Sequence, residues 1–302
     1  NPNLFEGHEL LAEAYYQSNQ TDQALLSARK ASEINPYSTT PYLMSGRILL
    51  ETGNVDRALE QAKLAIHQNK KNAEAVLFLA RVLMQKGEKQ QALAALEMTN
   101  QCENISVQNM IDHVNLVKEI NGGAYAKELI NDLSNKHPEN VELLKMLASA
   151  QADNGDTGDA EQTAKRALQV DPDEPELHLF LGKINAETGQ LDQAIHHLSQ
   201  GITSRREKTD GYLLLSKVYE QQREFTKAIE TLEQAMENSP SDTRSYLAAA
   251  NLYRNSKDYS AAEKVLQKAI EIDPKDVTIR RQLGALLALK LVHHSQEAGS
   301  QS

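Results

Sequence analysis

Apolar residues recur along this chain at helical spacing, in paired segments separated by a short break. The segment 141–174 shows the pattern most clearly. One helical face in each half is apolar: Leu144, Leu147, Ala148 and Ala152 in the first, and Ala160, Ala164, Ala167 and Leu168 in the second. Asn154-Gly155-Asp156 breaks the pattern between the halves, and Asp171-Pro172 ends it, because glycine terminates helices and the residue before proline leaves the helical region. We therefore predict an antiparallel helix pair joined by a short turn.

The same segment repeats along nearly the whole chain with a period of 34 residues. Alanine marks one position of every repeat: Ala24, Ala58, Ala92, Ala126, Ala160, Ala194, Ala228 and Ala262. The repeats start at Phe5, Thr39, Ala73, Val107, Val141, Pro175, Thr209 and Thr243. A fixed period of this length predicts a solenoid, in which each repeat buries its apolar face against its neighbours. Solenoids present long surfaces, so binding is the expected kind of function.

The repeat resembles the tetratricopeptide repeat (TPR). The matching residues are Leu11-Ala12, Tyr15, Ala24, Ala31 and Pro36 in the first repeat; Tyr212, Leu215, Tyr219, Ala228, Leu232, Ala235 and Pro240 in the seventh; and Tyr246, Tyr253, Ala262, Ala269 and Pro274 in the eighth. The resemblance covers about residues 5–276. It implies an all-α fold, a right-handed superhelical α-solenoid of antiparallel helix pairs. It also implies a non-enzymatic scaffold or adaptor that binds extended or helical protein segments in a concave groove.

The resemblance further implies that the fifth, ninth and twelfth positions of each first helix face a ligand. The predicted groove residues are Leu43, Arg47, Leu77, Arg81, Asn115, Leu179, Lys183, Leu213, Lys217, Leu247 and Asn251. An aliphatic stripe beside a basic and amide stripe suits a segment that bears acidic residues. The alternative is that the leucines pack between helices and the cations are solvated. The carboxylate clamp of chaperone-tail adaptors is not expected, since Lys145 is the only lysine at a fifth position and pairs with Ser149.

The fourth repeat, about 107–140, departs most from the pattern. His113-Val114 replaces the Leu-Gly/Ala pair, and Asn121-Gly122-Gly123 forms the turn. Just before it, residues 98–104 lose the apolar spacing of their helix. We predict a looser joint at 100–125 that divides the array into about 1–106 and 141–294. A functional hinge and simple divergence of a repeat that still stacks are both open interpretations.

Both ends of the chain carry signals of their own. Residues 277–294 begin like another first helix and are predicted to cap the last repeat, followed by a disordered polar tail at 295–302. The apolar run 283–292 suggests homo-oligomerisation through this helix. Pro2 lies 34 residues before Pro36, which is typical of a segment cut from a longer array or of a mature form; a coincidental lead-in is the alternative.

Charge and composition argue against nucleic acid as a partner and against a membrane-spanning segment. The net charge of −10, with 42 acidic and 32 basic residues, argues against a nucleic-acid binder. No stretch reaches the roughly 18 consecutive apolar residues that span a bilayer. The single cysteine, Cys102, excludes an intramolecular disulfide, and cytoplasmic and periplasmic locations are both compatible with the sequence.

No catalytic, cofactor or metal site is predicted. The nine histidines are scattered without ligand spacing and are expected at the surface; His196 and His197 are adjacent and should point in different directions. Cys102 has no base near it in sequence, so we do not expect a nucleophile.

Two other functions stay open. One is a self-assembling structural array that packs through the Pro2 side and residues 283–292. The other is the substrate-presenting TPR part of a larger enzyme or of a secretion or exopolysaccharide assembly. TPR glycosyltransferases use an asparagine ladder, whereas only Asn115 and Asn251 occupy the ninth position here.

Overall fold

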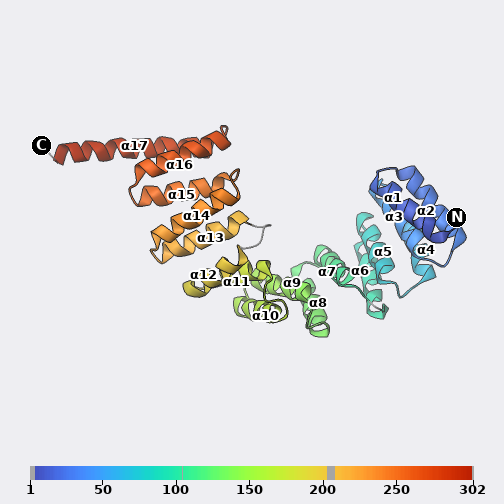
Figure 1. Ribbon diagram of the computed structural model, residues 1–302. Coiled ribbons are helices and arrows are strands. Elements are labelled where there is room, and N and C mark those ends of the chain that lie inside the picture. Colours follow the sequence, from blue (N-terminus) through green and yellow to red (C-terminus); the bar gives the residue numbers. More distant parts are fainter. Residues whose placement is uncertain (1–3, 104, 203–207, 301–302) are drawn as a thin grey trace. The chain divides into compact units, whose positions relative to one another are not determined.

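The computed structural model describes residues 4–103, 105–202 and 208–300, and all regular structure in these ranges is helical (Figure 1). The first helices of the repeats are α1 Phe5–Gln17, α3 Thr40–Glu51, α5 Ala73–Gln85, α7 Val107–Asn121, α9 Val141–Asp153, α11 Pro175–Glu187, α13 Lys208–Gln221 and α15 Thr243–Asn255. The second helices are α2 Thr21–Ile34, α4 Val55–Gln68, α6 Lys89–Glu97, α8 Gly123–Lys136, α10 Thr157–Val170, α12 Leu191–Gly201, α14 Phe225–Asn238 and α16 Tyr259–Ile272. Each predicted repeat start falls within one residue of a first helix, which confirms the all-α repeat fold.

The chain divides into two compact units, residues 1–151 (unit 1) and 152–302 (unit 2). Unit 1 holds the pairs α1/α2, α3/α4, α5/α6 and α7/α8 together with most of α9; unit 2 holds α10 and the pairs α11/α12, α13/α14 and α15/α16 (Figure 1). The division follows Gln151, inside α9, and so lies beyond the predicted joint at 100–125. The fourth repeat therefore belongs wholly to unit 1.

Small residues let the paired helices approach closely. All eight periodic alanines are buried, with at most 2% of their surface exposed. At position eight of the repeat, a Cβ added to Gly46 would lie 2.5 Å from Phe78 Cε1, and one added to Gly182 would lie 2.5 Å from Leu198 Cγ. A Cβ at either glycine would force the neighbouring side chain to shift, so close helix packing favours a small residue at these two positions.

The turn inside the repeat needs one residue in the left-handed region, and the fourth repeat places it differently. Seven repeats carry it at position fifteen, with φ between +57° and +87°: Asn19, Gly53, Gly87, Gly155, Gly189, Arg223 and Lys257. In the fourth repeat α7 continues through Asn121, and Gly122, with φ +86°, alone separates α7 from α8. Glycine adopts this conformation without the penalty that a Cβ brings.

The helix preceding the fourth repeat is also broken, as residues 98–104 predict. α6 has nine residues and gives way to the short 3₁₀ helix η1, Met98–Gln101. Thr99 Oγ1 donates to the Leu96 carbonyl at 2.7 Å and lies 3.3 Å from His113 Nδ1, which ties η1 to α7. Even so, α7, α8 and α9 share a core that contains Val114 and Leu147. The looser joint at 100–125 stays a prediction, which hydrogen exchange faster there than in the neighbouring turns would support.

The helix α17, Val277–Ser300, follows the eighth repeat. Its Ile279 and Leu286, which are 0% and 2% exposed, pack in one cluster with Leu266 and Ala269 of α16. The prediction of a disordered tail from residue 295 is wrong as far as Ser300, because the helix continues to that residue. Residues 301–302 lie outside the described residues. No proline interrupts this segment, and its glutamine, glutamate and alanine favour helix.

Candidate protein-binding surface

The inner face, defined as the fifth and ninth positions of the first helices, is closed at α3 and α5 of unit 1. Leu43 of α3 and Leu77 of α5 are only 3% and 4% exposed, and both belong to the core formed by α3 to α6. Leucines buried this far pack between helices and leave little surface for a ligand. For these two residues the structure agrees with the alternative interpretation of the leucine stripe.

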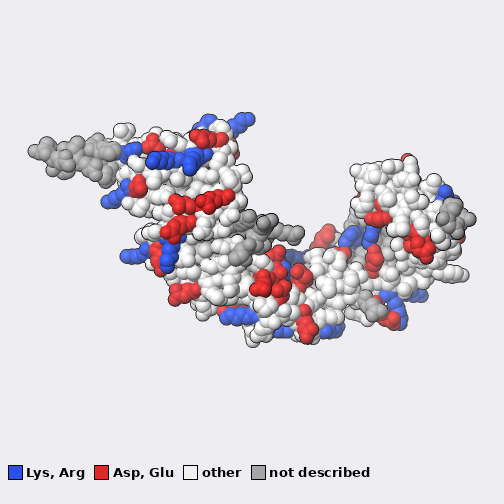
Figure 2. All heavy atoms as spheres, in the orientation of Figure 1, with Lys and Arg blue, Asp and Glu red and all other residues white. Residues whose placement is uncertain are grey.

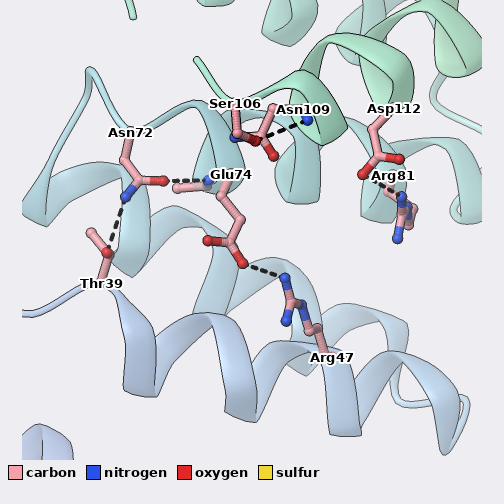
Figure 3. Close-up of polar contacts among 9 residues, drawn as sticks. Thr39, Arg47, Asn72, Glu74, Arg81, Ser106, Asn109 and Asp112 are labelled. Atoms are coloured by element: carbon pink, nitrogen blue, oxygen red, sulfur yellow. Dashed lines mark hydrogen bonds and ion pairs between the residues drawn. The ribbon is translucent and has the colours of Figure 1, made fainter. Parts of the chain in front are cut away.

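The arginines of the same face are paired across repeats. Figure 3 shows Arg47 of α3 directed at Glu74 of α5, with which it forms an ion pair. One repeat later, Arg81 Nη2 lies 3.5 Å from Asp112 Oδ2 of α7 (Figure 3). Both pairs are partly exposed, so each stabilises the fold by about 1 kcal/mol or less. Their larger effect is to neutralise the cations that a ligand would use.

A hydrogen-bonded cap joins the repeats beside these ion pairs. Asn72 Oδ1 accepts from the Ala75 amide at 2.9 Å and so caps α5, while Asn72 Nδ2 donates to Thr39 Oγ1 at 3.2 Å (Figure 3). Ser106 Oγ caps α7 in the same way by accepting from the Asn109 amide at 3.2 Å. These side chains satisfy helix N-termini that would otherwise lack partners.

The inner face of unit 2 is more open. Leu179, Leu213 and Leu247 are half-buried rather than buried. Lys183 and Lys217 are exposed, and neither forms an ion pair within the described residues of unit 2. Of the two predicted amides, Asn251 in unit 2 is half-buried and Asn115 in unit 1 is exposed. Unit 2 therefore has aliphatic surface next to two cations that form no ion pair with the residues described there.

Arg244 explains why these lysines lack acidic partners. The residue 27 positions after Arg47 is Glu74, but the residue 27 positions after Lys217 is Arg244. Arg244 forms ion pairs with Asp210 and, at 2.6 Å, with Asp242. Its guanidinium lowers the pKa of Asp242 to about 2. Asp210, which lies 27 positions after Lys183, is thus engaged by Arg244 instead.

His178 contradicts the expectation of a surface location, and His113 and His197 are half-buried. His178 is 7% exposed; its Nε2 lies 2.9 Å from the Pro172 carbonyl and its Nδ1 lies 3.0 Å from His197 Nδ1. In the second and eighth repeats, position four holds a tyrosine whose hydroxyl donates to the carbonyl of the proline six residues earlier: Tyr42 to Pro36 and Tyr246 to Pro240, each at 3.2 Å. His178 is buried because it replaces that tyrosine and donates from Nε2. Adjacency to His196 in the sequence gave no sign of this contact.

Burial also lowers the pKa of His113, to about 4. The pKa of His197 is also lowered to about 4, mainly by burial and to a smaller extent by the neighbouring His178. Both imidazoles are therefore neutral at pH 7.

The break in α6 leaves a cavity of about 420 Å³ that is lined by Leu77, Cys102 and His113 among others. Burial raises the pKa of the Cys102 thiol, which disfavours the reactive thiolate. Across the described parts of the chain, no three His, Cys, Asp or Glu side chains gather as metal ligands would. Within the same ranges, no helix has the length and apolar character to cross a membrane.

Charges of both signs are interspersed over the face drawn in Figure 2, without a continuous basic stripe. Single-sign stripes of Lys and Arg are the usual footprint of nucleic-acid binding. The face in view lacks such a stripe, which agrees with the net charge of −10.

Comparisons with known proteins place the chain in a family. A tetratricopeptide repeat profile matches residues 49–104, 124–184, 151–218 and 219–288. The chain is similar to the crystal structure of MamA, with 26% identity and a TM-score of 0.50 over 54% of this chain and 95% of that one. The structure of MamA 41-end from Desulfovibrio magneticus RS-1 aligns at 15% identity and a TM-score of 0.50, over 57% of this chain and 99% of that one.

The crystal structure of the APC/C hetero-tetramer Cut9-Hcn1 gives 16% identity and a TM-score of 0.50, over 91% of this chain and 54% of that one. Comparison with curated proteins gives no match. Because the profile covers more than half of the residues, the chain belongs to the tetratricopeptide repeat family.

Proposed function

We propose that this chain is a non-enzymatic scaffold whose inner face in unit 2 binds a segment of a protein partner. The observation that carries the proposal is the pairing of half-buried Leu179, Leu213 and Leu247 with the exposed lysines Lys183 and Lys217. Family membership supports it, because repeats of this type present extended surfaces to other proteins.

The chemistry of the face indicates the kind of partner. Aliphatic side chains spaced along α11, α13 and α15 suit the apolar side of an extended or helical segment. Lys183 and Lys217 would attract carboxylates on that segment, and the attraction would weaken as salt increases. A segment of this kind loses conformational entropy on binding, so affinity is modest.

The test is affinity capture from lysate of the source organism, with mass spectrometry of the retained proteins. The native chain is compared with the double variant K183E/K217E and with a matched control, K264E/K268E, which reverses the same charges on α16 outside the inner face. We expect a partner that the native chain and the control retain and that K183E/K217E loses. Equal retention by all three proteins would contradict the proposal.

A specific observation also favours self-assembly as a second function. On α17, Leu289 and Val292 lie three residues apart on one face and are 45% and 55% exposed, while Ile279 and Leu286 pack on α16. We propose that this apolar side pairs with a second copy of the chain. Light scattering should show a mass that rises with concentration and falls to that of the monomer in L289Q/V292Q; a monomer throughout the micromolar range would rule the idea out.

A further inference from the structure

Unit 1 has a second concave surface, which we call the outer groove. It has a volume of about 530 Å³ and lies among α2, α3 and α4. Ser45 and Leu49 of α3 line it together with side chains of the two second helices, and none of its lining residues belongs to the inner face. Its size falls within the range of ligand sites in proteins, about 300–1,000 Å³.

Two serines open the outer groove at positions that other repeats fill with apolar side chains. Ser45 occupies position seven, where five repeats have leucine: Leu11, Leu79, Leu147, Leu181 and Leu215. Ser32 occupies position twenty-eight, where five repeats have a larger apolar residue: Ile66, Leu168, Ile202, Met236 and Ile270. Both serines line the groove, and Ser32 Oγ is already satisfied by donating to the Arg29 carbonyl at 2.7 Å.

At two other positions the groove has a leucine where most repeats have a polar residue. Leu26 and Leu64 line it and are 54% and 42% exposed. Leu26 occupies position twenty-two, where most other repeats are polar: Glu60, Glu128, Gln162, His196, Glu230 and Lys264. Leu64 occupies position twenty-six, where the others are again mostly polar: Lys30, Asp132, Arg166, Gln200, Gln234 and Lys268.

Stability alone does not account for both exchanges. Replacing an inward leucine or isoleucine by serine forfeits apolar burial, and placing leucine on the outside exposes apolar surface to water. Together the exchanges produce a hollow, lined by both apolar and polar side chains, that a side chain from outside can fill. Exposed apolar side chains rimmed by polar ones are typical of an interaction site.

Two arginines give the outer groove a charge. Arg57 is exposed and forms no ion pair within the described residues of unit 1. Among the described residues, the ion pair of Arg29 is with Glu33 on its own helix, at 3.1 Å. Both side chains are more than 60% exposed, so this pair is weak. A ligand with carboxylates beside its apolar side chain would complement both arginines.

We propose that the outer groove binds an acidic segment of another protein by taking up an apolar side chain of leucine or phenylalanine size. Ser32 and Ser45 leave the space for this side chain, and Leu26 and Leu64 provide apolar contacts to it. Arg29 and Arg57 attract the flanking carboxylates. The site is separate from the inner face of unit 2, so one chain would hold two protein segments at once.

The test uses two labelled, blocked peptides of about 14 residues with leucines at helical spacing and either glutamate (acidic peptide) or lysine (basic peptide) at the other positions. Binding is measured by fluorescence anisotropy in a K183E/K217E background, so that the inner face of unit 2 contributes little. We expect the acidic peptide to bind and the basic peptide not to bind. Adding S32I/S45L, which fills the groove with the residues that other repeats use, should weaken binding at least about tenfold, as the loss of one buried apolar side chain would.

Two controls keep a folding defect from imitating this result. The melting temperature of the S32I/S45L variant should be unchanged or higher, because the added side chains are native to other repeats. L26Q/L64Q acts from the surface and should weaken binding to a similar extent, whereas V170Q/V277Q removes exposed apolar residues elsewhere and should not. The proposal for the outer groove would be overturned if the acidic peptide failed to bind in the K183E/K217E background. It would also be overturned if adding S32I/S45L left the binding unchanged. The proposed function of unit 2 is tested separately, by comparing the background with the native chain.

Discussion

Position nine of the repeat carries a cation in both units, but the two units use it differently. In unit 1, Arg47 and Arg81 form ion pairs with acidic residues of the next repeat, and the neighbouring Leu43 and Leu77 are buried. In the described residues of unit 2, Lys183 and Lys217 have no such partners, and the leucines beside them are half-buried. The same repeat position therefore joins repeats in one unit and remains available to a ligand in the other.

The difference depends on residues of the following repeat. Glu74 neutralises Arg47, whereas Arg244 stands at the equivalent distance from Lys217 and also occupies Asp210. A consensus motif that considers each repeat alone misses this, because the partner that decides the role lies in the next repeat. Four predictions test the comparison, from the largest effect to the smallest.

Truncating a leucine of the inner face should cost unit 1 much more stability than unit 2. We expect L43A to lower the free energy of unfolding by about 3 kcal/mol, because it opens a cavity in a buried core. L213A should cost about 1 kcal/mol, since its site is already half-exposed. Urea unfolding followed by circular dichroism measures both, and equal losses would mean that the two faces are equally buried.

Acid should destabilise unit 1 through His113. Its pKa in the folded protein, about 4, lies below the unfolded value near 6.5, so the unfolded chain takes up the proton first as the pH falls. Stability is therefore lost between pH 6.5 and about 4, by about 2 to 3 kcal/mol. H113L, which restores the leucine of other repeats, should flatten this part of the stability profile.

The contribution of His113 is read as the difference between the two unfolding profiles from pH 7 to 4. Profiles that stay parallel over this range would assign the acid sensitivity to other groups. His197, whose pKa is also about 4, remains in both proteins and cancels in the comparison.

Reversing the charge of Arg244 should make unit 2 resemble unit 1. In R244E, Lys217 gains an acidic neighbour and Asp210 becomes available to Lys183. We expect the inner face to bind the acidic peptide about threefold to tenfold more weakly, or roughly 1 kcal/mol. Anisotropy in the filled S32I/S45L background isolates this face. Unchanged affinity there would show that Arg244 does not control the lysines.

Removing an acid in unit 1 should have the smallest effect. E74Q frees Arg47 and should change the free energy of unfolding by less than about 1 kcal/mol, because the ion pair is partly exposed. The acidic peptide should gain at most about threefold, since Leu43 stays buried. A gain as large as the loss in R244E would show that charge alone, without exposed leucine, determines binding.

The sequence by itself determined the repeat, the helix pairs and the family. These follow from local and periodic requirements: alanine or glycine where helices touch, a left-handed residue at the turn, and proline at the repeat end. The break at 98–104 and the unusual turn at Asn121-Gly122 were also readable, because helix termination depends on nearby residues. The fold of Val277–Ser300 was predicted in part, and the helix proved longer than its apolar run.

The tertiary structure alone decided which predicted groove residues are exposed, because exposure and pairing depend on contacts between repeats. Leu43 and Leu213 share a position and a residue type, yet one is buried and the other half-buried. Only three-dimensional packing brought Arg47 to Glu74, His178 to His197, and Ser32 and Ser45 to one groove. A periodic sequence specifies which side chains each repeat carries. The packing of neighbouring helices determines which of these side chains are exposed and can bind a partner.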